Sequence, residues 1–332
     1  MHEQKQVLAV GIDVAKAKLD MRIIYTDESY KHCIIQNTEE GIADLANMLA
    51  DCHGKIVMES TGRYHLLCAL MLAETGLDVR VINPLMTKAY SKARIRNTKT
   101  DKVDAALLAE MARSDRHLPK SFKPNRTHVQ IRQKIGLVSS LEHQIQKLTA
   151  ILKNYKSFQE QLGGHLSEAE ESIGCSLKLL ISSKEKLTKE LESLIFSDDA
   201  NRVNRELLIS IPGISSYVAS LILHSFSKEY EHPKQWIAYI GMDVGLRESG
   251  TWHGRGRITK RGSAYLRKRL FSAAWGAVMH NDVFKSYYKI LKERGRHHTE
   301  ALIIISRKIL RISFSILKHN KPFSLQYLCS NP

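Results

Sequence analysis

Four acidic residues in the first third of the chain have the types and spacing that metal-assisted phosphate chemistry needs. Asp13 and Glu59 each come directly after a short apolar run, and Asp101 and Asp104 are spaced i,i+3. A carboxylate just past a buried strand lies at the edge of a sheet, and i,i+3 spacing places two side chains on one helix face. Converging carboxylates repel one another unless cations neutralise them, and oxygen ligands favour Mg²⁺ or Mn²⁺. We therefore predict a metal site that acts on a phosphodiester.

An ordinary structural explanation exists for these acids. Asp13 and Glu59 would simply end strands, and Asp101, next to Thr100, would cap the helix that follows. Basic residues beside the acids favour the metal interpretation, because the phosphates of a substrate would have to be held there. The alternative explanation of these basic residues is a solvated loop that is charged for solubility. The predicted nucleic-acid contacts in this segment are Lys92, Arg94, Arg96 and Lys99.

A glycine-rich, basic segment in the last third of the chain carries a second group of reactive candidates. Ser249 lies between Glu248 and Gly250, and a serine in such a loop acts as a nucleophile once its proton is removed. Thr251 and His253 are rivals for that role. The six glycines from 241 to 262 argue against a regular element and let the backbone approach DNA closely. The predicted phosphate contacts here are Arg247, Arg255, Arg257, Lys260 and Arg261.

The turn Ile211–Ile214 is a third candidate. It resembles the hairpin of helix-hairpin-helix modules, where backbone N–H groups hold a phosphate without reading sequence. The contacts would come from Pro212, Gly213 and Ile214, although Ser215 stands where such turns usually have a second glycine. A plain turn between two helices is equally open.

The elements that must position these residues divide the chain into three parts of an α/β plus α fold. Residues 1–122 alternate strands and helices in the order βββαβαβα, which indicates a mixed sheet covered by helices. Residues 123–200 hold two apolar seams, Val138–Tyr155 and Ile173–Leu194, separated by Gly163-Gly164. They predict an antiparallel helical hairpin or coiled coil that spaces domains, joins protomers or packs only on itself. Residues 201–332 are predicted to be mostly helical.

The charge balance of the 332-residue chain narrows the class of partner. Lys and Arg number 50 against 34 Asp and Glu, a formal net charge of +16. Such a field favours a polyanion, most often nucleic acid, over the alternative of a basic protein with no nucleic-acid role. No apolar run reaches the ~18 residues of a membrane span. Five scattered cysteines without a C-x-x-C pair argue against zinc and predict reduced, buried thiols in a cytoplasm.

Several segments, taken in order, resemble one protein family, the DEDD transposases of the IS110 and IS1111 insertion elements, which include the Piv DNA invertases. The resemblance covers nearly the whole chain except about residues 122–196. The segments that carry it are Val10–Asp20, Met58–Tyr64, Val81–Pro84, Asn97–Ala105, Ile211–Ile214 and Arg247–Gly250.

This resemblance implies a RuvC-like (RNase H-type) N-terminal domain, a coiled-coil middle and a C-terminal transposase domain. It places the DEDD acids on Asp13, Glu59, Asp101 and Asp104, and the nucleophilic serine on Ser249. It also implies a noncoding bridge RNA that pairs with donor and target double-stranded DNA. The active site would be composite in a homo-oligomer, a dimer or tetramer, with acids from one protomer and serine from another. We expect the two seams to make that assembly.

The function predicted on this basis is transposition or site-specific recombination through a serine–DNA covalent intermediate. Two other classes stay open. A RuvC-like, structure-selective endonuclease would need the acids but not Ser249. A non-enzymatic nucleic-acid-binding protein would need only the basic face and the phosphate-binding turn.

Overall fold

The computed structural model describes residues 5–324, except 61, 94–99, 124, 164, 166, 227–228, 246–247, 250–251 and 254–255. The chain divides into two compact units, residues 1–129 and 130–332, each with its own buried core. Among the helices of the described part, none is long and apolar enough to cross a membrane. The three parts predicted from the sequence, residues 1–122, 123–200 and 201–332, stay a prediction.

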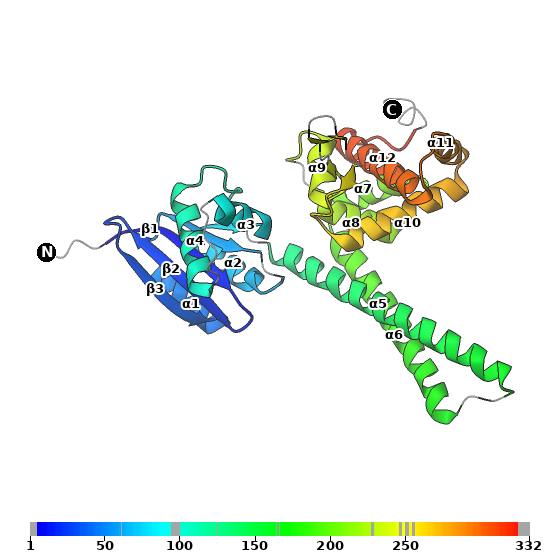
Figure 1. Cartoon of the computed structure of the whole chain (residues 1–332), viewed down its shortest axis with the longest axis horizontal. Helices are drawn as coiled ribbons and strands as arrows, with labels where there is room; N and C mark the ends of the chain where they lie inside the picture. The colour runs from blue at the N-terminus through cyan, green and yellow to red at the C-terminus, as the bar shows by residue number, and fades with distance from the viewer. Residues whose placement is uncertain are drawn as a thin grey trace. The chain divides into compact units, whose positions relative to one another are not determined.

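The first unit is built on a five-stranded mixed sheet in the order β3-β2-β1-β4-β5 (Figure 1). Strands β1 (Val7–Val14), β2 (Lys18–Tyr25) and β3 (Tyr30–Gln36) form an antiparallel meander. Strands β4 (Lys55–Glu59) and β5 (Asp78–Ile82) then pair in parallel, β4 with β1 and β5 with β4. Because β1 and β4 are parallel, both end at the same edge of the sheet.

Helices cover both faces of this sheet, and the alternation of side chains along β1 decides which residue meets which helix. Val10 and Ile12 are buried in the core that also holds buried residues of α1 (Glu39–Met48) and α2 (His65–Glu74). Ala9 on the opposite face packs with Leu108 and other buried residues of α4 (Asp101–Ser114). Asp13 shares this second face by the two-residue period of a strand.

Gly11 lets helix α4 lie directly on strand β1. A Cβ atom at Gly11 would lie 2.1 Å from the backbone nitrogen of Ala109 and 2.3 Å from the carbonyl oxygen of Ala105. Any side chain at this position would push the helix away, together with the acids in its first turn. The predicted strand and helix order also lacks one element, since α3 (Pro84–Ala93) forms between β5 and α4.

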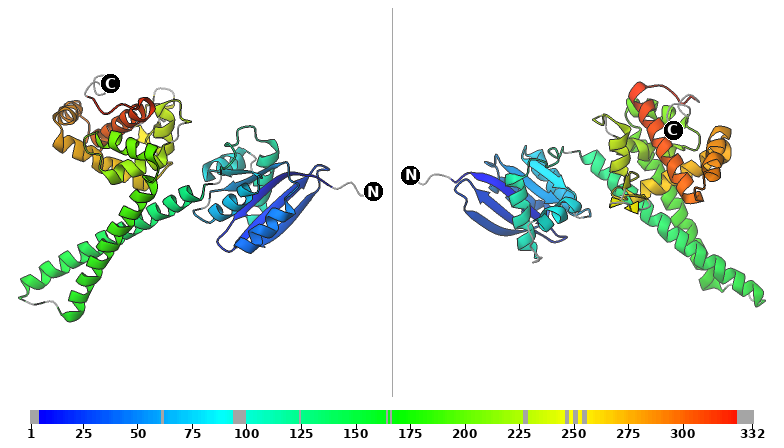
Figure 2. Two further views of the ribbon diagram at one scale, coloured as in Figure 1. Left: turned by 180° about the vertical axis from the view of Figure 1, so that it is seen from behind. Right: turned by 45° about the horizontal axis from the view of Figure 1, so that its top comes forward.

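The second unit contains a long helical hairpin made by α5 (Arg126–Gln161), which starts just before the unit boundary, and α6 (Glu168–Ile195) (Figure 2). Lys134 Nζ lies 2.7 Å from Glu190 Oε2, and the Tyr155 hydroxyl donates to Glu170 near the tip. Val138 is buried, but the far part of α5 and the residue directly after it expose an apolar stripe, which consists of Ile151, Tyr155, Phe158 and Leu162.

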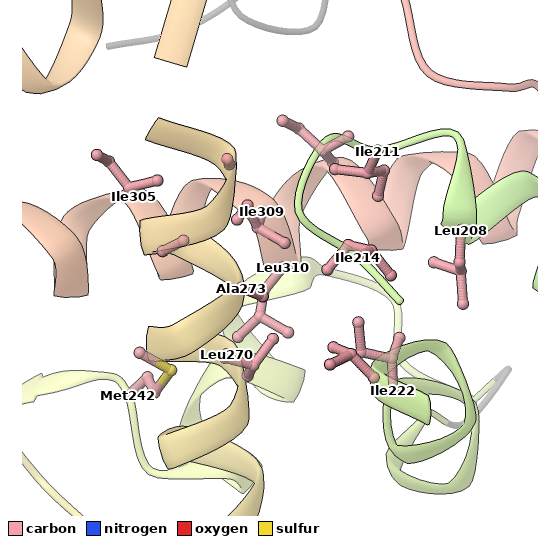
Figure 3. Packing of buried hydrophobic residues seen from close by; sticks show 14 of the residues in the cluster. Leu208, Ile211, Ile214, Ile222, Met242, Leu270, Ala273, Ile305, Ile309 and Leu310 are labelled. Atoms are coloured by element: carbon pink, nitrogen blue, oxygen red, sulfur yellow. The ribbon is translucent and has the colours of Figure 1, made fainter. Parts of the chain in front are cut away.

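Six further described helices enclose the main core of the second unit. Figure 3 shows Ile305, Ile309 and Leu310 packed beside Leu270 and Ala273 and near the turn that carries Ile211 and Ile214. The helices are α7 (Asp199–Ile209), α8 (Ser216–Ser225), α9 (Pro233–Ile240), α10 (Ala264–His280), α11 (Asp282–Glu293) and α12 (His298–His319).

Two expectations about this part of the chain were wrong. The glycine-rich segment does form regular structure, because β6 (Val244–Gly245) pairs with β9 (Arg257–Ile258) and β7 (Glu248–Ser249) pairs with β8 (Trp252–His253). Each of these two antiparallel ladders pairs only two residues on each strand, so the glycines between the strands do not prevent them from forming. The expectation of buried thiols also fails at two described cysteines, because Cys175 on α6 is exposed and Cys33 on β3 is only partly buried, whereas Cys52 and Cys68 are buried as expected.

Candidate active site

The acids Asp13 and Glu59 are placed at one edge of the sheet by the register of β1 and β4. Ile12 pairs with Met58 in the parallel ladder, and Asp13 and Glu59 are the next residue on each strand. Helix α4 crosses this face, and its first turn carries Asp101 and Asp104. The structure therefore brings the four acids predicted from the sequence to one place.

The pKa of Asp13 records how closely these charges approach one another. Burial is the largest cause of its rise to about 6, followed by the charges of Asp104, Asp101, Glu59 and Asp20 in that order. Each neighbouring carboxylate disfavours the ionised form of Asp13, because like charges in a partly buried site are poorly screened. The arrangement stores electrostatic repulsion that a bound cation would relieve.

Asp20 is a fifth carboxylate that the sequence analysis did not include in the site. It is the cross-strand partner of Asp13 in the antiparallel β1–β2 pair, and it is only 4% exposed. The signal was present in the strand itself, where Lys18 and Asp20 interrupt an otherwise mostly apolar run at alternating positions. Alternation places both side chains on the face that bears Asp13.

Lys18 joins this fifth acid to the predicted four. Its ammonium lies 2.8 Å from Asp20 Oδ2 and donates to Asp101 Oδ2, also at 2.8 Å. The hydrogen bonds to Asp101 and Asp20 raise the pKa of Lys18, and the bond from Lys18 lowers the pKa of Asp101. His32 Nε2 lies 3.3 Å from the other oxygen of Asp20.

The alternative explanation of Asp101 as a helix cap is wrong. Thr100 is the N-cap, and its hydroxyl accepts the hydrogen bond from the backbone N–H of Val103. Asp101 is the first helical residue, and its carboxylate is turned to Lys18 instead. A carboxylate in the first turn also gains from the positive end of the helix dipole.

The donor set fits a hard divalent cation, because carboxylate oxygens are the ligands that Mg²⁺ and Mn²⁺ prefer. In the described part of the chain, no three Asp, Glu, His or Cys side chains are already arranged to hold an ion. The positive charge that the structure places among the acids is the Lys18 ammonium. Ion binding at all four acids would therefore require side-chain movement.

Most of the basic segment before α4 lies outside the described residues, including Arg94, Arg96 and Lys99. Lys92 is described and lies exposed in the last turn of α3.

Ser249 lies on a short β arm formed by β6, β7, β8 and β9, and several contacts hold the base of this arm. The Thr259 hydroxyl donates to Asp243, and Arg267 donates to the carbonyl oxygens of Ile240 at 3.0 Å and Gly262 at 2.7 Å. The backbone of Ser249 pairs with Trp252 in the inner ladder. Sequence reasoning missed the three residues that hold the base of the arm.

Of the predicted phosphate contacts near this arm, Arg247 and Arg255 lie outside the described residues. Arg257, Lys260 and Arg261 are exposed at the base of the arm.

The predicted phosphate-binding turn is held in the core of the second unit. Ile211 and Ile214 are buried on either side of Pro212. A Cβ at Gly213 would lie 2.3 Å from the carbonyl oxygen of Ala273 on α10. The glycine is therefore explained by close packing of the turn against α10. Phosphate contact at Pro212, Gly213 and Ile214 stays a prediction.

Comparison with known proteins finds similarity along most of the chain. Residues 10–156 match a family described as transposase, and residues 205–289 match the transposase IS116/IS110/IS902 family. A pilin gene-inverting protein of Moraxella lacunata is 26% identical across 95% of this chain and 97% of its own length. The transposase for insertion sequence element IS1111A of Coxiella burnetii is 24% identical, with 96% of this chain and 92% of the relative covered.

Proposed function

Because the chain belongs to the IS116/IS110/IS902 family of transposases, enzymes that act on DNA, we propose that it cuts and rejoins DNA strands by transesterification. In this proposal Asp13, Glu59, Asp101 and Asp104 hold Mg²⁺ or Mn²⁺, and Ser249 is the nucleophile. The observation that carries it is the crowding of carboxylates around Asp13, whose pKa is raised first by burial and then by the charges of the other three acids. Such a cluster is costly to keep without a cation.

We infer that the first unit is a RuvC-like (RNase H-type) domain and the last third a transposase domain. The sheet order, with an antiparallel meander followed by two parallel strands, supports the first assignment. The gathering of acids where β1 and β4 end and α4 begins supports the same assignment.

The proposed step conserves the number of phosphate ester bonds. The Ser249 oxygen forms a bond to phosphorus, the bond from phosphorus to one deoxyribose oxygen breaks, and the leaving oxygen gains a proton while serine loses one. A strand hydroxyl then attacks the phosphoserine and restores both the phosphodiester and the free serine. No ATP is needed, because the bond energy stays in the covalent link. A divalent ion held by the acids would supply positive charge to the transition state.

We propose that an element-encoded bridge RNA selects the donor and target double-stranded DNA by pairing, so that the protein contacts mainly backbone phosphates. The exposed Arg257, Lys260 and Arg261 and the net charge of +16 support a phosphate-binding role. Sequencing the RNA that copurifies with the full chain tests this. A single defined species is expected, and its absence would contradict RNA guidance without affecting the recombinase assignment.

We also propose that the chain works as a dimer or tetramer in the cytoplasm, where it meets its DNA. The apolar stripe of α5 supports self-association, because a monomer would leave it exposed to water. The composite site inferred from the family resemblance requires such an assembly.

Trapping the covalent intermediate tests the assignment of Ser249. DNA nicked close to the cleavage site loses a short fragment after attack, so that the protein stays attached and migrates as a denaturant-resistant adduct. We expect wild-type protein to form the adduct and Ser249→Ala to form none. Thr251→Ala and His253→Ala, changes at the rival residues, are expected to retain it.

Three results would contradict the proposal. An adduct with Ser249→Ala would place the nucleophile elsewhere. Cleavage by Ser249→Ala without any adduct would favour a hydrolytic nuclease. Full activity of Asp13→Ala would remove the acids from the mechanism.

A further inference from the structure

Lys18 makes contacts that distinguish it from an ordinary surface lysine. Its side chain is 43% exposed, yet its ammonium is shared at 2.8 Å by two carboxylates of different elements, Asp20 on β2 and Asp101 on α4. Asp20 is 4% exposed. A buried carboxylate is stable only when cations or hydrogen-bond donors compensate it. One of the two partners of the Lys18 ammonium is therefore fixed inside the fold and does not move into solvent.

The other partner of Lys18 is one of the acids proposed to hold metal. The ammonium donates to Asp101 Oδ2, so it competes with a divalent ion for that oxygen. An ammonium and a metal ion on one carboxylate repel each other. Metal binding through Oδ2 therefore requires Lys18 to leave that oxygen, and Asp20 offers it a second partner.

We propose that Lys18 is a tethered counter-ion of the acidic site, positioned by the buried Asp20. In the metal-free protein it neutralises Asp101 and reduces repulsion among the acids. On metal entry it withdraws to Asp20, so that divalent ions bind only above the concentration needed to displace it. The inference rests on the proposed function, because it takes the four acids as the metal-binding set.

A second ion pair of the same sheet provides a matched control. Lys5 Nζ lies 2.6 Å from Asp27 Oδ2, and both side chains are exposed. Lys5 precedes β1 and Asp27 follows β2, so this pair lies at the end of the sheet opposite to Asp13. Replacement of Lys5 removes the same charge from the same unit without touching the acids.

The test is a titration of full-length protein with Mn²⁺ alone, followed by thermal unfolding. For wild type we expect the unfolding temperature to rise with Mn²⁺, and for Asp104→Asn we expect that rise to be largely lost. Lys18→Gln should unfold at a lower temperature without metal. It should reach half-maximal stabilisation at a Mn²⁺ concentration on the order of fivefold lower than wild type does. This shift corresponds to the free energy that one partly exposed ion pair contributes. Lys5→Gln should titrate as wild type does.

A charge-balanced variant separates occupation of Asp101 from a general effect of charge. Lys18→Gln with Asp20→Asn leaves the net charge of the site unchanged and removes both members of the ion pair, so that no buried Asp20 charge is left uncompensated to destabilise the fold. Because the Asp101 oxygen is free in this variant, its Mn²⁺ midpoint should stay below that of wild type.

Each of the remaining outcomes overturns the inference. A wild-type midpoint in Lys18→Gln would leave the metal site and the proposed function intact but deny Lys18 this role. A lowered midpoint in Lys18→Gln together with a wild-type midpoint in the double variant would show that only the net charge of the site matters. The Lys18 ammonium would then not be displaced from Asp101. The absence of any Mn²⁺ effect in wild type would reject the metal site itself, and the inference with it.

Discussion

At Asp13, burial and the neighbouring carboxylates raise the pKa from 3.8 to about 6. A carboxyl group that binds its proton more tightly in the folded chain favours folding at low pH. That contribution is lost as pH rises from about 4 to about 6, and above this range the ionised Asp13 opposes folding. Burial sets the sign of this effect first, and the charges of Asp104, Asp101, Glu59 and Asp20 add to it.

The change Asp13→Asn should therefore stabilise the protein while abolishing strand cleavage. In buffers with chelator, we expect little difference in unfolding temperature at pH 4, a gain that grows up to about pH 6, and a constant gain of a few degrees above it. Thermal unfolding at several pH values measures this. Asp27→Asn is the control of opposite sign, because Lys5 lowers the pKa of Asp27 to about 2. Equal curves for wild type and Asp13→Asn would contradict the electrostatic account.

At the scale of elements, the turn between α7 and α8 is fixed by one glycine. Gly213 has a φ of +83°, and a Cβ there would meet backbone atoms of Ala273 and Ala277 at 2.3 and 2.6 Å. These are backbone atoms, so no side-chain rotation relieves the clash. We expect Gly213→Ala to lower the free energy of unfolding by roughly 2–4 kcal/mol.

Gly276, on the helix that receives the turn, is the matched control. A Cβ there would lie 3.6 Å from Gly213, an ordinary van der Waals distance. Gly276→Ala should be neutral or stabilise by up to ~1 kcal/mol, because alanine is the better helix former. Denaturant unfolding of both variants checks the pair. Equal losses in the two would show that the turn does not pack as described.

The elements that the sequence predicted well are those with a clear apolar period. The strands that carry Asp13 and Glu59 and the helix of Asp101 and Asp104 were all predicted, which is why the acidic edge was foreseeable. The missed helix, α3, begins with a proline, Pro84. At the first helical position proline lacks only an N–H that the helix does not use, so it starts a helix there.

The Lys18–Asp20 pair was missed for a different reason. Its meaning depends on register, because Asp20 matters only as the cross-strand partner of Asp13 and Lys18 only through its contact with Asp101. A single strand shows alternation but not the strand or helix that faces it. The short ladders of the Ser249 arm were equally inaccessible, since two-residue strands carry no period.

At the scale of the whole molecule, the two halves of the proposed catalytic centre belong to different compact units. Asp13 lies in the unit of residues 1–129 and Ser249 in the unit of residues 130–332. A chain built this way has two options: to complete the site within one protomer, or to exchange halves between protomers. Our proposal of a composite site takes the second option. It predicts that two chains with different defects can form one working site together.

Two inactive variants should therefore restore activity to each other. In a mixed oligomer of Asp13→Asn and Ser249→Ala chains, the intact acids of one protomer face the intact serine of the other, so one complete site forms. We expect strand cleavage to return in chains refolded together or coexpressed, at a fraction of the wild-type rate. Asp13→Asn mixed with Asp104→Asn should stay inactive, because both lack an acid. If the first mixture is as inactive as this control although the chains coassemble, the centre is completed within one protomer.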